Sequence, residues 1–454
     1  MKNKLVILGL ILSFGIVFTS CDDDDDDDND TVQTWNTAGG AFYISTAEGV
    51  AYADADAAET TLKAAFEAGQ NVFADPGITV EGNSINPVAT GDYSSKGAFA
   101  DDPTWADWTI TAELFMGGSG NSTTDAGKPI KTISDDGSGT GTVTWSKDTV
   151  YLLDKFVFVN DGDVLTIEAG TVVKGKPGTG ENASALIVAR GGKIMAEGTA
   201  NEPIIFTAED DDLTTTTDLT QNDDSKWGGV IVLGKATLNS AAGETPIEGI
   251  PTSESRGIYG GNNDTDNSGV FKYVSIRHGG SDIGEGNEIN GFTLGGVGSL
   301  TVLDNVEVFT NKDDGIEFFG GSAFVTHAVV VACGDDSFDY DEGWHGGGQY
   351  WFTYQVEDRG DRCGEHDGGT DPEDGAPYAI PAISNVTYVG NGNKGLITFR
   401  DNAGGHYSNS IFMNTAKGID VELLVDEQDS YKRFSEGDLT VTNSVFYNVA
   451  GGVN

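Results

Sequence analysis

The sequence has few basic residues for its size. It holds 25 lysines and arginines against 72 aspartates and glutamates, which gives a formal net charge of −47. A surface of that sign repels the phosphates of nucleic acids and of anionic lipids, so we expect no nucleic-acid partner and no electrostatic docking on a membrane. Such an excess of carboxylates on a protein favours solubility and the binding of divalent cations.

Cysteine and histidine are also scarce. Apart from Cys21, the chain has only Cys333 and Cys363. In an oxidising compartment these two could form a disulfide, but the sequence does not show whether their Cα atoms lie within bonding range, so two free thiols stay an equal alternative. The five histidines form no HxxxH pair, so the sequence gives no support for a zinc site.

One long apolar run is present, at the N-terminus. It extends from Leu5 to Phe18, follows Lys2 and Lys4, and leads into the tetrapeptide FTSC. The run is too short and wrongly flanked for a membrane-spanning helix, so residues 1–20 are predicted to be a secretory signal peptide. FTSC resembles a bacterial lipobox, in which the cysteine is diacylated, and Cys21 is therefore the predicted lipid attachment to the membrane. Ordinary cleavage beside an incidental cysteine is the alternative.

An acidic linker and a small mixed region follow Cys21. Residues 21–35 begin with CDDDDDDDND, in which like charges repel and nothing apolar can be buried, so this segment is predicted to be a solvated tether. In residues 36–140, the segment YADADAAETTLKAAFEAG (52–69) has apolar residues at helical spacing, and the remainder is rich in turns. We expect a small N-terminal α+β cap that packs on the following domain.

From about residue 141 the chain becomes a series of short strands. The 64 glycines and the abundance of Asn, Asp, Thr and Val disfavour helices. Four segments share an asparagine, alternating apolar residues and a second asparagine: DNVEVFTN (304–311), SNVTYVGN (384–391), SNSIFMN (408–414) and TNSVFYN (442–448). The closing asparagines are expected to lie in turns, with their amides hydrogen-bonded along a stack.

The spacing of these segments indicates coils of about 22–24 residues. The first three are followed by DGIEFF, KGLITF and KGIDVE, so Gly315, Gly395 and Gly418 are expected to mark one structural position. Asp313-Asp314 recurs one such step later as Asp335-Asp336. This period predicts an all-β fold, a right-handed parallel β-helix over residues 141–454. An antiparallel sandwich has no reason to repeat Asn and Gly in such a register.

Several phrases of the chain resemble those of a known group of proteins. LTIEAGTVVKGK, ALIVARGGKI, KWGGVIVLGKA, GVFKYVSIRHGG, INGFTLGGVGS and NKDDGIEFFGG are similar to a family of uncharacterised β-helical surface lipoproteins common in Bacteroidetes, over roughly residues 97–448. The resemblance implies a lipid-anchored protein of the outer membrane that is exposed at the cell surface, and it makes the acidic run after Cys21 an export signal. By analogy, such lipoproteins assist outer-membrane transporters, but the family carries no established reaction.

The acidic residues of two neighbouring repeats form the strongest candidate site. Asp313, Asp314 and Glu317 recur as Asp335, Asp336 and Asp339, and Asp341 follows shortly after. Equivalent positions on adjacent coils lie about 4.8 Å apart, so at least six carboxylates would share one patch. Their repulsion is relieved by a cation, and Ca²⁺ takes such hard oxygen ligands. The alternative is that these aspartates cap backbone amides in solvated turns.

A catalytic role for the same acids is a weaker hypothesis. Asp313, Asp335 and Asp336 are spaced like the carboxylates of β-helical glycoside hydrolases that cleave pectin, and paired carboxylates can hydrolyse a glycosidic bond. The Gly-His-Gly and Arg-x-Lys elements of those enzymes are missing. A calcium-dependent lyase would need a Lys or Arg base beside the metal, and residues 313–342 contain neither.

Two further sets of residues lie close to these acids in the sequence. Trp344, His345, Tyr350 and Trp351 could stack on and hydrogen-bond to carbohydrate, although alternate aromatic residues are also typical of a core. The loop at 357–377 carries a possible second cation site, formed by Asp361, Glu365, His366 and Asp367.

Together these patterns predict a surface-exposed outer-membrane lipoprotein. Its β-helix is expected to be non-catalytic and stabilised by calcium, and to present loops to a polysaccharide, a nutrient, a partner protein or an outer-membrane transporter. Two alternatives stay open: a calcium-dependent polysaccharide lyase or glycoside hydrolase, and an adhesin whose acids bridge to other surfaces through calcium.

Overall fold

The computed structural model describes residues 41–46, 50, 52–118, 120–121, 123–284, 287–369, 371–424 and 429–450. The predicted signal peptide (1–20), Cys21 and the acidic tether (21–35) lie outside these residues. Within the described ranges, no helix has both the length and the apolar character needed to cross a membrane.

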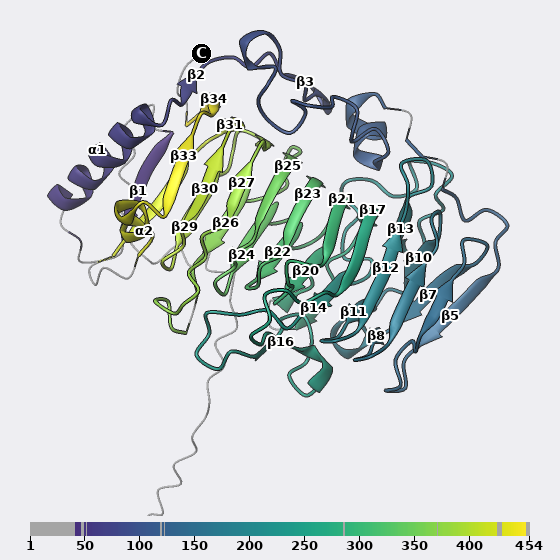
Figure 1. Cartoon of the computed structure of the whole chain (residues 1–454). Helices are drawn as coiled ribbons and strands as arrows, with labels where there is room; N and C mark the ends of the chain where they lie inside the picture. The colour runs from purple at the N-terminus through teal and green to yellow at the C-terminus, as the bar shows by residue number, and fades with distance from the viewer. Residues whose placement is uncertain are drawn as a thin grey trace, which may run out of the picture.

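Two parallel sheets run along the length of the molecule (Figure 1). The first has ten strands in the order β1-β32-β29-β26-β24-β22-β20-β14-β11-β8, and the second has 18 strands. Each strand of a coil pairs in parallel with the equivalent strand of the next coil, as Ile316 of β22 does with Phe338 of β24. The molecule is therefore a parallel β-helix, which confirms the predicted fold class.

The ten-stranded sheet takes one short strand from each coil. Its strands are β8 (Phe156–Val159), β11 (Ala185–Val188), β14 (Val230–Leu233), β20 (Phe292–Gly295), β22 (Ile316–Phe319), β24 (Phe338–Asp341), β26 (Gly364–Asp367), β29 (Ile397–Arg400), β32 (Ile419–Leu423) and β1 (Phe42–Thr46). Along each strand alternate residues enter the core, so the residues between them lie on the outer face.

The 18-stranded sheet forms the other two sides of the coils. Its strands are β2 (Val72–Phe73), β5 (Ile130–Ser134), β6 (Val143–Trp145), β7 (Val150–Asp154), β9 (Val164–Ile167), β10 (Val172–Gly175), β12 (Lys193–Glu197), β13 (Ile204–Ala208), β17 (Gly269–Arg277), β21 (Val302–Phe309), β23 (Phe324–Val331), β25 (Gly347–Tyr354), β27 (Ala382–Ser384), β28 (Thr387–Val389), β30 (Gly405–Ser408), β31 (Ile411–Thr415), β33 (Leu439–Thr442) and β34 (Val445–Val449).

The remaining elements lie outside the coils. Three antiparallel pairs join β3 (Thr79–Glu81) to β4 (Ser84–Asn86), β15 (Thr245–Pro246) to β16 (Ile258–Tyr259), and β18 (Asp282–Gly284) to β19 (Asn287–Glu288). The helices are α1 (Tyr52–Ala68), α2 (Ser430–Glu436), the π-helix η2 (Ala112–Met116) and three short 3₁₀ turns, η1 (Gly91–Tyr93), η3 (Gly180–Asn182) and η4 (Ser255–Gly257). The helix predicted at 52–69 is thus present as α1.

The coil length is regular only in part. Ile316 pairs with Phe338 and Ile397 pairs with Ile419, and both steps agree with the predicted coil length. The predicted equivalence of Gly395 and Gly418 is wrong by one position, because Leu396 is the residue aligned with Gly418. Longer steps, such as that from Glu365 to Thr398, contain loops that interrupt the repeat.

Asparagines mark corners of the last coils. The predicted stacking of the closing asparagines is present for Asn414 and Asn448, whereas the amides of Asn311 and Asn391 donate to backbone carbonyl oxygens. Asn409 and Asn443 both have positive φ angles, 55° and 51°, a conformation that asparagine tolerates better than most residues. Asn443 Nδ2 donates to Asn409 Oδ1 at 3.1 Å, and Asn448 Nδ2 donates to Asn414 Oδ1 at 3.1 Å. These amides link equivalent corners of neighbouring coils.

The N-terminal region covers the last coil rather than the first. β1 pairs in parallel with β32, with Phe42 opposite Ile419, and β2 pairs with β34. In Figure 1 the purple α1 and β1 lie beside the yellow β33, and the chain then runs along one side of the helix to β5 at the opposite end. Since β5 pairs in parallel with β7, the paired strands of the 18-stranded sheet extend back to Ile130.

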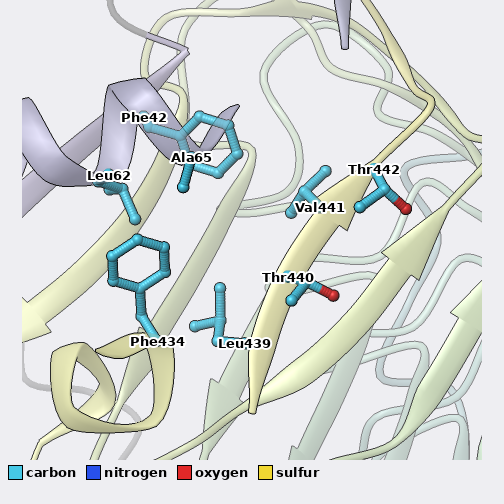
Figure 2. Close-up of a pocket in the computed structure, with 8 residues that line it drawn as sticks. All are labelled: Phe42, Leu62, Ala65, Phe434, Leu439, Thr440, Val441 and Thr442. Atoms are coloured by element: carbon cyan, nitrogen blue, oxygen red, sulfur yellow. The ribbon is translucent and has the colours of Figure 1, made fainter. Parts of the chain in front are cut away.

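The two helices close the end of the solenoid over a small apolar hollow of about 90 Å³ (Figure 2). Leu62 of α1 and Phe434 of α2 face each other across it, and Leu439 and Val441 of β33 form its floor. Leu62 is buried in the main core cluster, so the α1 cap continues the interior of the β-helix.

Candidate metal centre

The turns that lead into β22, β24 and β26 stack on one another and carry acidic residues. The backbone N–H of Gly315 donates to the carbonyl oxygen of Asp336 at 3.0 Å, and the N–H of Asp361 donates to the carbonyl oxygen of Asp335 at 3.2 Å. Asp313-Asp314, Asp335-Asp336 and Asp361-Arg362 therefore occupy equivalent positions in three successive coils.

A second acidic row lies on the strands that follow these turns. Glu317, Asp339 and Glu365 are aligned across β22, β24 and β26. Because Ile316 and Phe318 belong to the core, Glu317 between them lies on the outer face of the sheet. The turn acids and the strand acids thus meet along one edge of the ten-stranded sheet.

Three groups of carboxylates are close enough to share a cation. In each group the potential ligand oxygens all lie within 4.8 Å of one another; the groups are Asp313, Asp314 and Asp335; Asp314, Glu317 and Asp339; and Asp335, Asp336 and Asp361. Asp314 belongs to two groups and Asp335 to two, so the three form one continuous cluster, which we call the acidic corner.

The predicted metal ligands are brought together with one exception. Asp313, Asp314, Glu317, Asp335, Asp336 and Asp339 all lie in the acidic corner, whereas Asp341 belongs to none of its groups. Asp341 is 4% exposed and accepts the backbone N–H of Glu342.

Most of the acidic corner is buried. Asp314 is 5% exposed and Glu317 is 2% exposed, while Asp336 is 2% and Asp339 is 4% exposed. Asn290, which is aligned with Asp314 on the preceding coil, donates its amide to Glu317 and, at 3.3 Å, to Glu248. Charged groups in such surroundings are costly unless they are paired or bound to a metal.

Electrostatics in the acidic corner oppose full ionisation. Burial raises the pKa of Asp314 well above its ordinary value, and the negative charges of Asp339, Asp336, Asp313 and Asp335 raise it further. Burial and the charge of Glu365 likewise raise the pKa of Asp336, although Arg362 acts in the opposite direction. A bound cation or bound protons would relieve this repulsion.

Two of the turn aspartates also bind backbone amides. The N–H of Asp336 donates to Asp314 Oδ1 at 2.8 Å, and the N–H of Arg362 donates to Asp336 Oδ1. One oxygen of Asp314 and one of Asp336 therefore cap a backbone amide, as the alternative interpretation expected. Both residues still belong to groups that could share a cation.

In the third coil, arginine side chains pair with the acids. Arg362 Nη1 lies 2.6 Å from Asp361 and 2.8 Å from Glu365, and Arg400 Nε lies 2.8 Å from Asp367. Although burial opposes it, Glu365, Asp336 and Asp361 raise the pKa of Arg362 above its ordinary value. The acidic corner therefore ends in an ion-pair network.

The structure does not assemble the second predicted cation site, at Asp361, Glu365, His366 and Asp367. Arginines neutralise Glu365 and Asp367, and Asp361 joins the acidic corner instead. His366 points into the core, where its ring stacks 3.9 Å from that of Tyr340 and burial lowers its pKa to about 3. The segments GDRCGEHD (360–367) and GDDSFDYD (334–341) have similar sequences, which could have indicated that they are equivalent. The longer coil between them breaks the regular spacing, so the repeat alone does not reveal it.

The predicted carbohydrate platform is also not formed. Trp344 and Trp351 are 0% and 1% exposed, and they stack on Phe318 at 4.1 Å and Phe338 at 4.6 Å in the interior. Both rings therefore belong to the core, because β22, β24 and β25 place their apolar faces there.

The other two residues of that set reach the surface in part. His345 Nε2 lies 3.7 Å from Asp264 Oδ2. The ring of Tyr350 stacks 5.0 Å from that of His327, and its hydroxyl donates to Asp101. Neither residue belongs to the acidic corner.

Cys333 and Cys363 are both buried free thiols, so the disulfide that the sequence left open is not formed. Cys363 directly precedes β26 and is aligned with Ser337, whereas Cys333 lies earlier on the same coil as Ser337. Burial raises the pKa of the Cys333 thiol to about 12.

Stacked parallel coils with an acidic edge define a parallel β-helix protein with metal-competent turns. Residues 137–454 match the model of the pectate-lyase-like β-helix domain family. Because this match covers well over half of the chain, the protein belongs to that family. Comparison with curated proteins and with solved structures gives no match.

Proposed function

We propose that this protein is a non-catalytic, calcium-stabilised β-helix, attached to the outer membrane through the lipid on Cys21, that presents its loops to a polysaccharide, a nutrient or a partner protein. The overlap of three carboxylate groups in the acidic corner carries the calcium part of the proposal. Carboxylates that converge from three coils suit the flexible coordination of Ca²⁺ by six to eight oxygens.

The family name makes a polysaccharide lyase the main alternative, but the chemistry of the acidic corner does not favour it. A lyase base must release its proton, whereas acidic neighbours raise the pKa of Arg362 and Arg400. A hydrolase needs two accessible carboxylates, about 6.5–9.5 Å apart in inverting enzymes. Asp314 and Asp336 are buried, and the oxygens of each acidic group lie within 4.8 Å.

Thermal unfolding of the full mature chain with Ca²⁺, with Mg²⁺ and with a chelator tests the calcium proposal. We expect Ca²⁺ to raise the unfolding temperature more than Mg²⁺, because the smaller ion demands octahedral geometry. The combined Asp335→Asn and Asp336→Asn substitutions should abolish that difference. Equal unfolding temperatures with Ca²⁺ and with chelator would contradict the proposal.

An assay on polygalacturonate distinguishes a non-catalytic β-helix from a lyase or hydrolase. We expect no new reducing ends and no unsaturated products with the wild type in the presence of Ca²⁺. Release of products by the wild type, together with its loss in the Asp335→Asn and Asp336→Asn variant, would establish the enzyme in place of the scaffold.

The proposed surface location rests on the lipobox-like FTSC and the acidic run after it. Replacement of Asp22 to Asp28 by alanine should leave the protein lipidated but facing the periplasm, where protease added to intact cells does not reach it. Unchanged cleavage at the surface would reduce the run to a tether.

A further inference from the structure

A polar hollow of about 520 Å³ lies away from the acidic corner, on the outside of the 18-stranded sheet. Its walls are the loop after β13, with the run Thr214 to Thr217, and the N-terminal segment around η2, with Glu113 and Asn121. Arg277 and His278, at the end of β17, also line it. Its volume falls within the range of about 300–1,000 Å³ that is typical of small-molecule sites.

Arg277 is buried in this wall without an acidic partner. It is 4% exposed, and within the described part of the chain its side chain makes one hydrogen bond, from Nε to Ser275 Oγ at 2.8 Å. No described carboxylate lies within ion-pair distance of its guanidinium. Buried arginines are ordinarily paired with an anion, and among the described residues none supplies one to the two terminal nitrogens of Arg277.

The buried carboxylates in this region are committed elsewhere. Asp211, which also lines the hollow, accepts the hydroxyl of Thr207 at 2.5 Å and the N–H of Leu213 at 3.0 Å. Glu307, which is fully buried, accepts the backbone N–H of Ile110 and, at 2.9 Å, that of Thr111. It also accepts the hydroxyl of Ser275 at 2.6 Å. These bonds fasten the N-terminal segment to β21 and leave Arg277 to face the hollow.

The rest of the lining favours a ligand that also carries a positive charge. Two exposed acids, Glu113 and Asp218, line the hollow. Asp218 follows the run Thr214 to Thr217, and its Oδ2 accepts the N–H of Asp212. His278 is 1% exposed, its Nδ1 lies 2.8 Å from the carbonyl oxygen of Asp223, and burial lowers its pKa. Among the described lining residues there is no Phe, Tyr or Trp, and carbohydrate sites ordinarily use such rings.

We propose that this hollow binds a small zwitterion of the amino-acid or short-peptide class, with its carboxylate on Arg277, its ammonium group beside Glu113 and Asp218, and its polar atoms on the threonine hydroxyls. Arginine and carboxylate match in a bidentate geometry, which gives such a contact both strength and direction. This site does not depend on calcium in the acidic corner.

Calorimetric titration of the full mature chain tests the site with four probes. L-alanyl-L-alanine carries both charges, N-acetyl-L-alanine only the carboxylate, L-alaninamide only the ammonium group, and D-galacturonate a carboxylate with hydroxyls. We expect the dipeptide to bind most tightly and to lose at least tenfold in affinity in Arg277→Gln. Arg433→Gln is the matched control, since Arg433 is 2% exposed but paired with Glu436 and Asp438, and it should leave the affinity unchanged.

A second variant keeps the test decisive if Arg277→Gln does not fold. Glu113→Gln removes an exposed acid, and it should weaken binding of the dipeptide while leaving that of N-acetyl-L-alanine unchanged. The proposal is overturned if the dipeptide does not bind at millimolar concentration, if Arg277→Gln binds it as the wild type does, or if D-galacturonate binds in its place.

Discussion

Asp314 and Asp336 occupy the same position in neighbouring coils, and the backbone N–H of Asp336 donates to Asp314 Oδ1 at 2.8 Å. One oxygen of Asp314 therefore helps to hold the stack, while the carboxylate remains part of two metal-competent groups. The same residue thus joins coil-to-coil packing to the charge balance of the acidic corner.

Asp314→Asn should separate these two roles. Asparagine can still accept the N–H of Asp336, but it removes a negative charge, so the calcium-free protein should become more stable. The stabilisation by Ca²⁺, which reaches about 2.7 kcal/mol at a hundred times the Kd, should fall by more than half. Asp341→Asn is the control, because Asp341 is buried on the same face outside the acidic corner. Equal calcium effects in the two variants would count against the site.

The calcium-free protein should lose stability as the pH rises. The folded-state pKa values of Asp314 and Asp336 lie above the ordinary value of 3.8, so the folded state keeps protons that the unfolded state releases. The stabilising effect of these protons is complete below that ordinary value and is lost as the pH rises through the folded-state values. Urea unfolding with a chelator should give a larger free energy of unfolding at pH 5 than at pH 8, and Ca²⁺ should reduce the difference. A larger value at pH 8 would contradict this.

Glu422 should also make the protein less stable as the pH rises, and this effect does not depend on calcium. Burial, with the charge of Asp401, raises the pKa of this carboxyl to about 8. Its folded state holds a proton between the ordinary pKa of 4.5 and about 8, so stability falls across that window as the pH rises. Glu422→Gln can still accept the N–H of Asp401. It should stabilise the protein at pH 8 by on the order of 2 kcal/mol and have little effect at pH 4. An effect that is the same at both values would exclude this cause.

Leu62→Ala should weaken the cap over the last coil. Leu62 is 2% exposed and borders the small hollow between α1 and α2, so its loss enlarges an apolar void. A Leu→Ala change in a core costs about 2–5 kcal/mol, and we expect the lower half of that range here. Thr61→Ala, on the exposed side of the same helix, should change the free energy of unfolding by less than about 0.5 kcal/mol. Similar losses in both variants would show that α1 does not act through its packing.

The sequence predicts those features that recur at a regular spacing from coil to coil. The regular step from Glu317 to Asp339 is directly visible, and it predicts both the stacked strands and most of the acidic corner. Asp361 escapes this reasoning, because the step from Asp339 to Glu365 is longer and the repeat loses its regular spacing there. Trp344 and Trp351 are ambiguous for another reason: aromatic residues beside acids have the same local pattern in a core and in a binding surface.

Other features depend on contacts that no local pattern encodes. Phe42 pairs with Ile419, at nearly the opposite end of the chain, so the sequence predicts a cap but not which end it covers. Arg277 lies in the phrase GVFKYVSIRHGG, but that phrase does not show what surrounds the side chain. Its significance comes from Glu307 being bound by the backbone of Ile110 and Thr111, a segment far away in the sequence.

The pairing of β1 with β32 also imposes an order of events on the growing chain. The strand that is synthesised among the first must wait for one that is synthesised among the last, so the coils can stack progressively while the end of the solenoid stays open. Until residues 419–423 are made, the edge of the ten-stranded sheet has unpaired backbone groups that can join a neighbouring molecule. β1 can therefore pair only after β32 has been synthesised. A chain that stops earlier keeps an unpaired sheet edge, which favours aggregation.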